Sequence, residues 1–203
     1  MDFINDLNIE KSKKQYLEQL IEKVKKLMKL PLFDHSINTL KFALQIVKKH
    51  REDVDIYSLG VSCILHDYGK IFNREQLAAI VKKHHPEVSS FELKLGSVLH
   101  ALAGDFLVSR DFGITDEKIL RSIRYHTTGY LGMSTGDKIL LIADRAEEGR
   151  VYKDVKKIRE LALEDINLCL IEVYKNTIIY VVNKGKPLHP DTSRVWNSIS
   201  GGN

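Results

Sequence analysis

The sequence predicts an all-α protein folded as a helical bundle. Apolar residues recur at the three- and four-residue spacing of an amphipathic helix along most of the 203 residues. Residues that cap helices, such as Asp55 and Asn73, precede several of these periodic segments. The segment with strand-like composition, I-I-Y-V-V at 178–182, has no second strand to pair with, so we assign it to a helix.

Composition limits the class of protein. The chain is 43% hydrophobic and 29% charged, which is enough apolar material to bury a core. Its net charge of +4 is too small to indicate a nucleic-acid partner, but it suits an anionic substrate. No apolar run approaches the roughly 20 residues of a membrane span and no secretion signal is present, so we expect a cytoplasmic protein without membrane contact. Cys63 and Cys169 lie in apolar helical patterns and are expected to be reduced core thiols.

We expect a single domain over residues 31–199, preceded by a helical extension at 1–30 and followed by a short tail at 200–203. Residues 1–10 have a mixed composition and are expected to be poorly ordered. The segment Lys11–Leu30 predicts a helix rich in lysine. These lysines could contact polyphosphate or RNA, but a solvated helix face is the simpler interpretation.

Histidines and acids lie at helix ends in the first half of this domain. Pro31 ends the first helix, and Asp34–His50 predicts a second helix with His35 in its first turn. A third helix runs into the adjacent pair His66 and Asp67. A carboxylate buried against so apolar a helix needs a cation or hydrogen-bond donors, which favours metal binding by this pair.

Three further segments follow the same pattern. The helix capped by Asn73 ends in H-H-P at 84–86, whose basic setting indicates an exposed helix end. One helix is predicted over Leu95–Phe112, with small residues around His100 that allow close approach of a ligand or another helix. The next helix ends in H-T-T-G at 126–129, where an imidazole and two hydroxyls could meet phosphate oxygens.

The C-terminal half supplies one more acid and a scaffold. The segment Asp137–Arg150 predicts a helix whose apolar face ends at Asp144. The segment Asp154–Asn183 contains no proline or glycine and predicts one long packing helix. A turn and a short helix follow, with His189 expected on the surface.

Residue type selects the partners of the His66-Asp67 pair. A cation that activates water binds neutral imidazoles and carboxylates rather than amides or hydroxyls. The candidate partners of this kind are His35, His100, His126 and Asp144. Such ligands suit iron, manganese, cobalt or zinc, and the absence of thiolates removes only the strongest argument for zinc.

The order of His35, the His66-Asp67 pair and Asp144 on successive helices resembles the HD superfamily of metal-dependent phosphohydrolases, an all-α fold. Four longer sequence motifs resemble those of the YqeK-type branch, the bacterial symmetrical diadenosine tetraphosphate hydrolases. These motifs are H-D-Y-G-K at 66–70, L-H-A-L-A-G-D at 99–105, H-T-T-G at 126–129 and A-D-R-A-E-E-G-R at 143–150. The similarity covers about Pro31 to Ile199.

This resemblance implies an iron-containing hydrolase that cuts diadenosine tetraphosphate at its central bridge and releases two ADP. The implied metal ligands are His35, His66, Asp67 and Asp144. The residues implied to face the nucleotide are His100, His126, Thr127, Thr128 and Arg150. The resemblance thus makes the dinucleoside polyphosphate the expected partner, and a homodimer is compatible with it.

The chain departs from the branch at three places. It has Gly69 where alanine is usual, Glu148 where proline is usual, and P-L-F-D at 31–34 where a basic residue usually precedes the first histidine. The third departure removes a possible phosphate contact at that end of the pocket.

The residue types themselves support phosphoanhydride hydrolysis. Asp67 would help to hold the cation, and His100 would act as a proton donor or phosphate ligand. Lys70 and Arg150 would stabilise charge on the transferring phosphoryl group. Arg150 could instead form a surface ion pair with Glu147 or Glu148.

The number of cations is open at this point. His100 and His126 could complete a second metal site bridged by Asp67. No further carboxylate is evident for a second ion, since Asp105 lies more than a turn beyond His100. We therefore expect one metal.

Two other functions remain compatible with the sequence. The first is another HD-type nucleotide hydrolase, acting on nucleoside triphosphates or alarmones. The second is a non-catalytic helical domain that binds nucleotide or RNA and uses the metal as a structural staple. The complete set of histidines and acids argues against the second.

Overall fold

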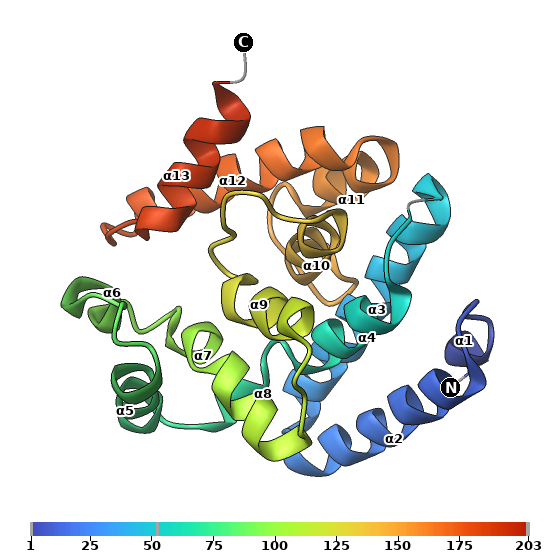
Figure 1. The fold of residues 1–203 in the computed structure, drawn as a ribbon. Helices are drawn as coiled ribbons and strands as arrows, with labels where there is room; N and C mark the ends of the chain where they lie inside the picture. Colours follow the sequence, from blue (N-terminus) through green and yellow to red (C-terminus); the bar gives the residue numbers. More distant parts are fainter. Residues whose placement is uncertain (1, 52, 202–203) are drawn as a thin grey trace.

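The computed structural model describes residues 2–51 and 53–201, and these residues form no strand. The all-α prediction is therefore confirmed (Figure 1). The helices are α1 (Asp2–Asn5), α2 (Lys11–Leu27), α3 (Leu30–His50), α4 (Ile56–Leu65), α5 (Arg74–His84), α6 (Ser90–Lys94), α7 (Leu99–Leu102), α8 (Gly104–Phe112), α9 (Glu117–Tyr125), α10 (Thr135–Ala146), α11 (Val155–Glu164), α12 (Ile166–Asn183) and α13 (Pro190–Ser200), with a 3-10 helix, η1 (Tyr68–Ile71), after α4.

The predicted caps begin the helices that carry the site. The Asp55 side chain accepts a hydrogen bond from the backbone N–H of Ser58 at the start of α4. Asn73 forms a reciprocal capping box with Gln76 at the start of α5. Each such cap satisfies backbone N–H groups that have no partner within the helix.

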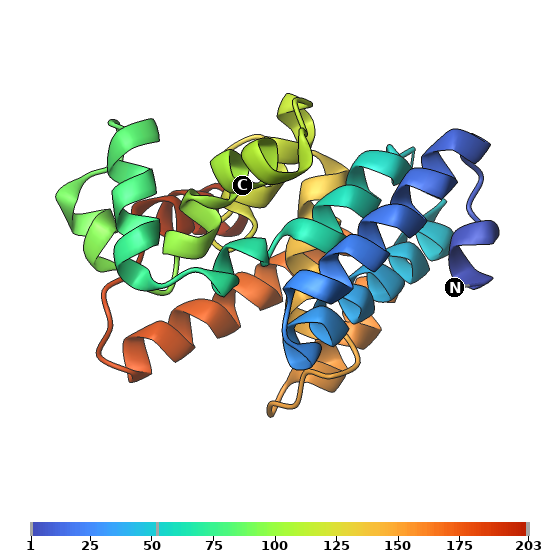
Figure 2. The same ribbon diagram turned by 90° about the horizontal axis from the view of Figure 1, so that it is seen from below.

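Helices α3, α4 and α10 pack against one another at the centre of the fold. Figures 1 and 2 show α10 near the middle of the molecule, with α2 to α4 on one side and α5 to α7 on the other. Fully buried Leu40, Ile64 and Ile142 come from these three helices. Burial of each such side chain contributes about 1.5 to 3 kcal/mol. The best-packed part of the molecule therefore carries the candidate residues at its helix ends.

Two predicted helices are broken in the structure. The segment Leu95–Phe112 was predicted as one helix, but it divides into α7 and α8 at Ala103. After the break, α7 and α8 both contact η1 and α9, and a Cβ on Gly104 would lie 2.8 Å from Ile123 on α9. Close helix packing therefore overrides the continuous helical pattern.

The long scaffold helix is also two helices, α11 and α12. Its break lies at Asp165, whose backbone is extended (φ −151°, ψ 114°). The Asp165 carboxylate accepts hydrogen bonds from the backbone N–H groups of Asn167 and Leu168. An aspartate that caps a new helix can end an uninterrupted apolar pattern without proline or glycine.

The N-terminal expectations need correction. Residues 2–5 form α1, and Ile4 is fully buried, so the described residues 2–10 are not simply a poorly ordered segment. Pro31 lies in the first turn of α3 instead of ending α2, as expected for a residue without a backbone N–H. Helix α2 packs on α3 and α4 within the same core. The boundary at residue 30 between an N-terminal extension and the main domain stays a prediction.

Two histidines assigned to the surface are buried. His85 Nε2 lies 2.9 Å from Asp105 Oδ1, whereas His84 is exposed as predicted. His189 is 5% exposed and accepts a hydrogen bond from the backbone N–H of Asp191 at the start of α13. Their burial comes from elements distant in sequence, which a local pattern does not reveal. Across the described residues, no helix combines the length and apolar character of a membrane span.

Candidate metal centre

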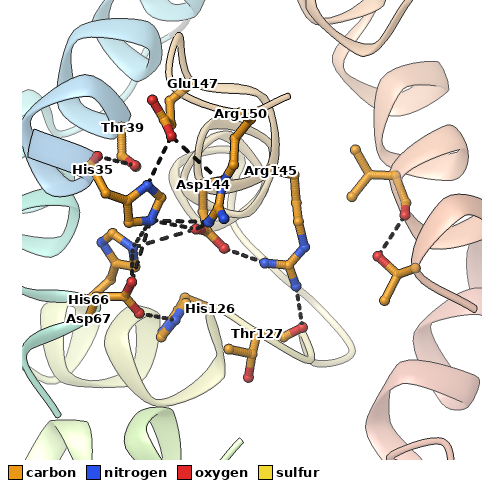
Figure 3. Close-up of polar contacts among 12 residues, drawn as sticks. His35, Thr39, His66, Asp67, His126, Thr127, Asp144, Arg145, Glu147 and Arg150 are labelled. Atoms are coloured by element: carbon orange, nitrogen blue, oxygen red, sulfur yellow. Dashed lines mark hydrogen bonds and ion pairs between the residues drawn. The ribbon is translucent and has the colours of Figure 1, made fainter. Parts of the chain in front are cut away.

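Side chains from α3, α10 and the segments after α4 and α9 converge on one cluster (Figure 3). His35 Nε2 lies 2.9 Å from Asp144 Oδ1 and 3.4 Å from Asp67 Oδ2. His66 Nε2 lies 3.2 Å from His35 Nε2 and 3.6 Å from Asp144 Oδ1. Residues 31 to 109 positions apart thus meet at one point.

His66 and His126 are oriented by the ends of their own helices. The Nδ1 atom of His66 lies 2.9 Å from the carbonyl oxygen of Cys63, and that of His126 lies 2.7 Å from the carbonyl oxygen of Ile123. The last carbonyl groups of a helix have no intrahelical partner, so they accept these Nδ1–H bonds. Both Nε2 atoms consequently face the cluster, where each can offer a lone pair to a cation once the imidazole is neutral.

Asp67 lies between two groups of imidazoles. Its Oδ2 faces His35 and His66, at 3.4 and 3.5 Å from their Nε2 atoms. Its Oδ1 lies 3.2 Å from His100 Nε2 and 3.5 Å from His126 Nε2. The carboxylate is therefore placed to bridge two sites.

Two sets of ligands result, each with donor atoms within 4.8 Å of one another. The first contains the four residues predicted to bind metal: His35, His66, Asp67 and Asp144. The second contains Asp67, His100 and His126. The expectation of one metal rested on the lack of a further carboxylate, and the geometry shows Asp67 available to both sets.

The donor atoms fit divalent transition metals. Asp67 Oδ1 is buried and, within the described part of the chain, accepts no properly aligned hydrogen bond. A buried carboxylate oxygen without such a bond is costly unless a cation compensates it. Nitrogen and oxygen donors without thiolates suit iron, manganese, cobalt or zinc.

Both cysteines lie outside the cluster, in the core, as predicted. Burial raises the pKa of Cys63 and of Cys169, so each remains a thiol. Neither therefore supplies a thiolate ligand.

The cluster is strongly coupled electrostatically. Burial alone would raise the pKa of Asp67, but the charge of His66 and the nearby imidazoles of His100 and His126 hold it well below its usual value. Burial alone would lower the pKa of His66, yet the charge of Asp67 and the contacts with Asp144 raise it to about 10. Burial lowers the pKa of His126 to about 4. The carboxylates are thus ionised at neutral pH.

Three cationic side chains surround the carboxylates. Lys70 Nζ lies 2.6 Å from Asp67 Oδ2, with 41% of its side chain exposed. Arg150 Nη2 donates to Asp144 Oδ1 at 2.7 Å. Arg145 pairs with Asp144 and also donates to the carbonyl of Thr127 at 3.0 Å. These groups could reach phosphate oxygens at the edge of the cluster.

The two threonines occupy different settings. Thr127 Oγ1 is buried and has no hydrogen-bond partner among the described residues. Thr128 Oγ1 donates to the carbonyl of Gly129 at 3.1 Å, and its side chain is buried. Among the described residues, the Thr127 hydroxyl is thus buried and unpaired, whereas that of Thr128 is engaged.

Residues 32–149 match the model of the HD domain. The chain belongs to the HD domain family. It is 31% identical to the symmetrical bis(5'-nucleosyl)-tetraphosphatase of Bacillus subtilis (strain 168) over 185 residues, which cover 91% of this chain and 98% of that protein. A protein of the same name from Staphylococcus aureus (strain NCTC 8325 / PS 47) is 30% identical over 88% of this chain and 87% of its own.

The family assignment agrees with a solved HD structure. The 1.50 Å crystal structure of a predicted HD superfamily hydrolase involved in NAD metabolism, from Clostridium acetobutylicum, superposes with a TM-score of 0.84. Its sequence is 30% identical, and the match covers 92% of this chain and 97% of that chain. The similarity thus extends beyond the HD segment to nearly the whole fold.

Sequence reasoning missed two residues of this HD site. Glu147 lies 3.1 Å from His35 Nδ1, and Arg145 pairs with Asp144. Both follow Asp144 within one helical turn, in A-D-R-A-E-E-G-R, and resemble ordinary surface charges. Their closeness in sequence to Asp144 was the one feature that could have indicated a role in the site.

Proposed function

We propose that this protein hydrolyses diadenosine tetraphosphate symmetrically, adding one water and releasing two ADP. The observation that carries the proposal is full-length similarity to curated symmetrical bis(5'-nucleosyl)-tetraphosphatases. The converging histidines and acids of the HD cluster supply groups that the reaction needs. The activity, the substrate and the residue roles below all form part of this proposal.

The chain's own residues would hold two cations. His35, His66, Asp67 and Asp144 form one set, and His100, His126 and Asp67 form the other. The inward direction of both Nε2 atoms favours cation binding over direct phosphate contact for His100 and His126. The cations would supply an activated water nucleophile and neutralise charge on phosphate oxygens. Iron is the proposed metal, with manganese, cobalt and zinc as alternatives.

The polyphosphate would be bound by side chains at the edge of the cluster. Arg150 offers a planar pair of donors and is 37% exposed, so it can contact an oxygen while remaining near Asp144. Lys70 provides a mobile charge beside Asp67. The buried hydroxyl of Thr127 would donate to a further phosphate oxygen after a change of rotamer that brings it to the edge of the cluster. These cationic groups would stabilise negative charge on the transferring phosphoryl group and the leaving ADP.

The test is hydrolysis of diadenosine tetraphosphate by protein freed of metal and then supplied with iron, manganese, cobalt or zinc. Chromatography should show ADP as the sole product. In water enriched in ¹⁸O, one of the two ADP molecules should carry the label. AMP together with ATP would contradict the symmetrical cut. Absence of turnover with every metal, alongside turnover of a nucleoside triphosphate or alarmone, would indicate another nucleotide hydrolase.

A further inference from the structure

The imidazoles of the cluster are oriented in two different ways. His66 and His126 use backbone carbonyls three residues before them, at 2.9 and 2.7 Å. The Nδ1 atom of His35 instead lies 3.1 Å from Glu147 Oε1, a side chain 112 positions away. Of these three orienting acceptors, the Glu147 carboxylate alone can be changed by mutation.

The position of His35 explains the difference. It lies inside α3, where the preceding carbonyls accept hydrogen bonds from the helix backbone. His66 and His126 follow α4 and α9, where such carbonyls are free. An imidazole within a helix therefore needs an acceptor from another element to fix its ring.

Glu147 is built into that position. It is 3% exposed and directly follows α10, with a non-helical backbone (φ −55°, ψ 163°). Its Oε2 accepts the backbone N–H of Gly149 at 2.5 Å, and its Oε1 lies 3.7 Å from Arg150 Nε. A Cβ on Gly149 would lie 3.1 Å from the carboxylate, so the glycine gives it room. The carboxylate is thus buried and held on more than one side.

We propose that Glu147 is a positioning residue for the metal centre. Its carboxylate accepts the Nδ1–H of His35 and thereby fixes the tautomer in which the Nε2 lone pair faces the first set of ligands. This rests on the proposed metal centre. Carboxylates that accept the second N–H of a metal-bound histidine typically affect metal affinity by about 10- to 100-fold.

The arrangement also links two ligands through one helix end. Asp144 is in the last turn of α10, and Glu147 follows three residues later. One backbone segment therefore positions the ligand Asp144 and also Glu147, which orients the ligand His35. His35 therefore keeps its orientation relative to Asp144, whose Oδ1 lies 2.9 Å from its Nε2. A shift of this helix end would move both together.

The test is the affinity of the full chain for Mn²⁺ and Zn²⁺, measured by competition with a metal-binding dye in the absence of nucleotide. Glu147→Gln should weaken binding by about 10-fold or more, because a neutral amide is a poorer acceptor for His35. Glu148→Gln is the matched control, since it makes the same change at an exposed neighbouring position and should leave affinity unchanged. Equal affinities for the wild type and Glu147→Gln would overturn the proposal.

A mutant cycle separates positioning from general structural damage. In a His35→Gln background, Glu147→Gln should cause no further loss of affinity, because the ring that it orients is absent. The same loss in both backgrounds would show that Glu147 acts by another route, such as Arg150. Glu147→Asp keeps the charge but shortens the reach, and should bind metal more tightly than Glu147→Ala. The comparison of Glu147→Asp with Glu147→Ala also tests the positioning role if Glu147→Gln folds poorly.

These measurements are independent of the proposed activity. Weakened metal binding by Glu147→Gln in a protein that cannot cleave diadenosine tetraphosphate would refute the function and retain the positioning role. Unchanged metal binding by Glu147→Gln in a protein that cleaves diadenosine tetraphosphate would refute the positioning role and retain the function.

Discussion

The phenol of Tyr174 donates a hydrogen bond to the backbone carbonyl of Thr128 at 2.8 Å. Tyr174 is buried on α12, and Thr128 belongs to the loop that follows His126. The bond ties the C-terminal scaffold to the H-T-T-G loop beside the cluster. The next residue, Gly129, has φ +68°, and a Cβ there would collide with the Tyr174 hydroxyl.

An alanine in the left-handed conformation costs about 1 to 2 kcal/mol. Gly129→Ala should lower the free energy of unfolding by more than this, because the collision with the Tyr174 hydroxyl adds to the cost. Tyr174→Phe should cost about 1 kcal/mol alone, through loss of the hydrogen bond. Together the two changes should cost less than their sum, since the hydroxyl that collides is gone. Urea denaturation of the four proteins tests this, and strict additivity would contradict the contact.

Gly69→Ala should destabilise the protein although alanine is the residue expected from the resemblance. A Cβ on Gly69 would collide with the backbone carbonyl of His100, and backbone cannot rotate away. Separation of η1 from α7 would widen the 3.2 Å gap between Asp67 and His100. We expect a loss of about 1 to 3 kcal/mol and weaker metal binding.

The control for this change is Gly96→Ala. A Cβ on Gly96 would make only ordinary contact, 3.6 Å from the Arg74 side chain. It should unfold at nearly the wild-type urea concentration. Equal midpoints for Gly69→Ala and Gly96→Ala would show that η1 and α7 have more room than the structure gives.

Asp67→Asn and Arg150→Ala should separate metal binding from phosphate binding. Asp67 contributes to both ligand sets, so Asp67→Asn should lose metal and turnover together. Arg150 contacts Asp144 through its guanidinium, and its removal should lower kcat about 10²- to 10³-fold while metal is retained. Elemental analysis after gel filtration and single-turnover hydrolysis measure the two effects. Metal at wild-type content in Asp67→Asn would refute the assignment of both sets.

The side chains that converge on the cluster could be predicted from the sequence, whereas the groups that orient them could not. His35, the His66-Asp67 pair and Asp144 stand out because each imidazole or carboxylate lies near the start or the end of an apolar helical pattern, a local property. Glu147 carries no such mark, since its role depends on an imidazole 112 positions away. The bridging geometry of Asp67 likewise depends on how four helices pack.

The fold shows the same division. The helical nature of the segments follows from local periodicity, and the caps Asp55 and Asn73 follow from residue type; both were predicted correctly. The breaks at Ala103 and Asp165 depend on packing and capping that the apolar pattern does not record. Burial of His85 and His189 depends on Asp105 and Glu92, which lie on other elements.

His189 should make the protein less stable in acid. Burial lowers its pKa, although Asp191 and Glu92 act in the opposite direction. The folded protein therefore takes up a proton at this imidazole at a lower pH than the unfolded chain, which does so near pH 6.5. Since the unfolded state binds more protons, the free energy of unfolding falls as the pH drops through this range.

His189→Asn provides the test, because asparagine can accept the same capping bond from Asp191 and does not titrate. Urea denaturation across the acidic range should show a smaller loss of stability in His189→Asn than in the wild type. His189→Ala should be about 1 kcal/mol less stable than His189→Asn at every pH, because it removes the cap as well. The other histidines are unchanged in these variants, so a difference in slope reports this residue. Identical pH dependence in the wild type and His189→Asn would place the acid sensitivity elsewhere.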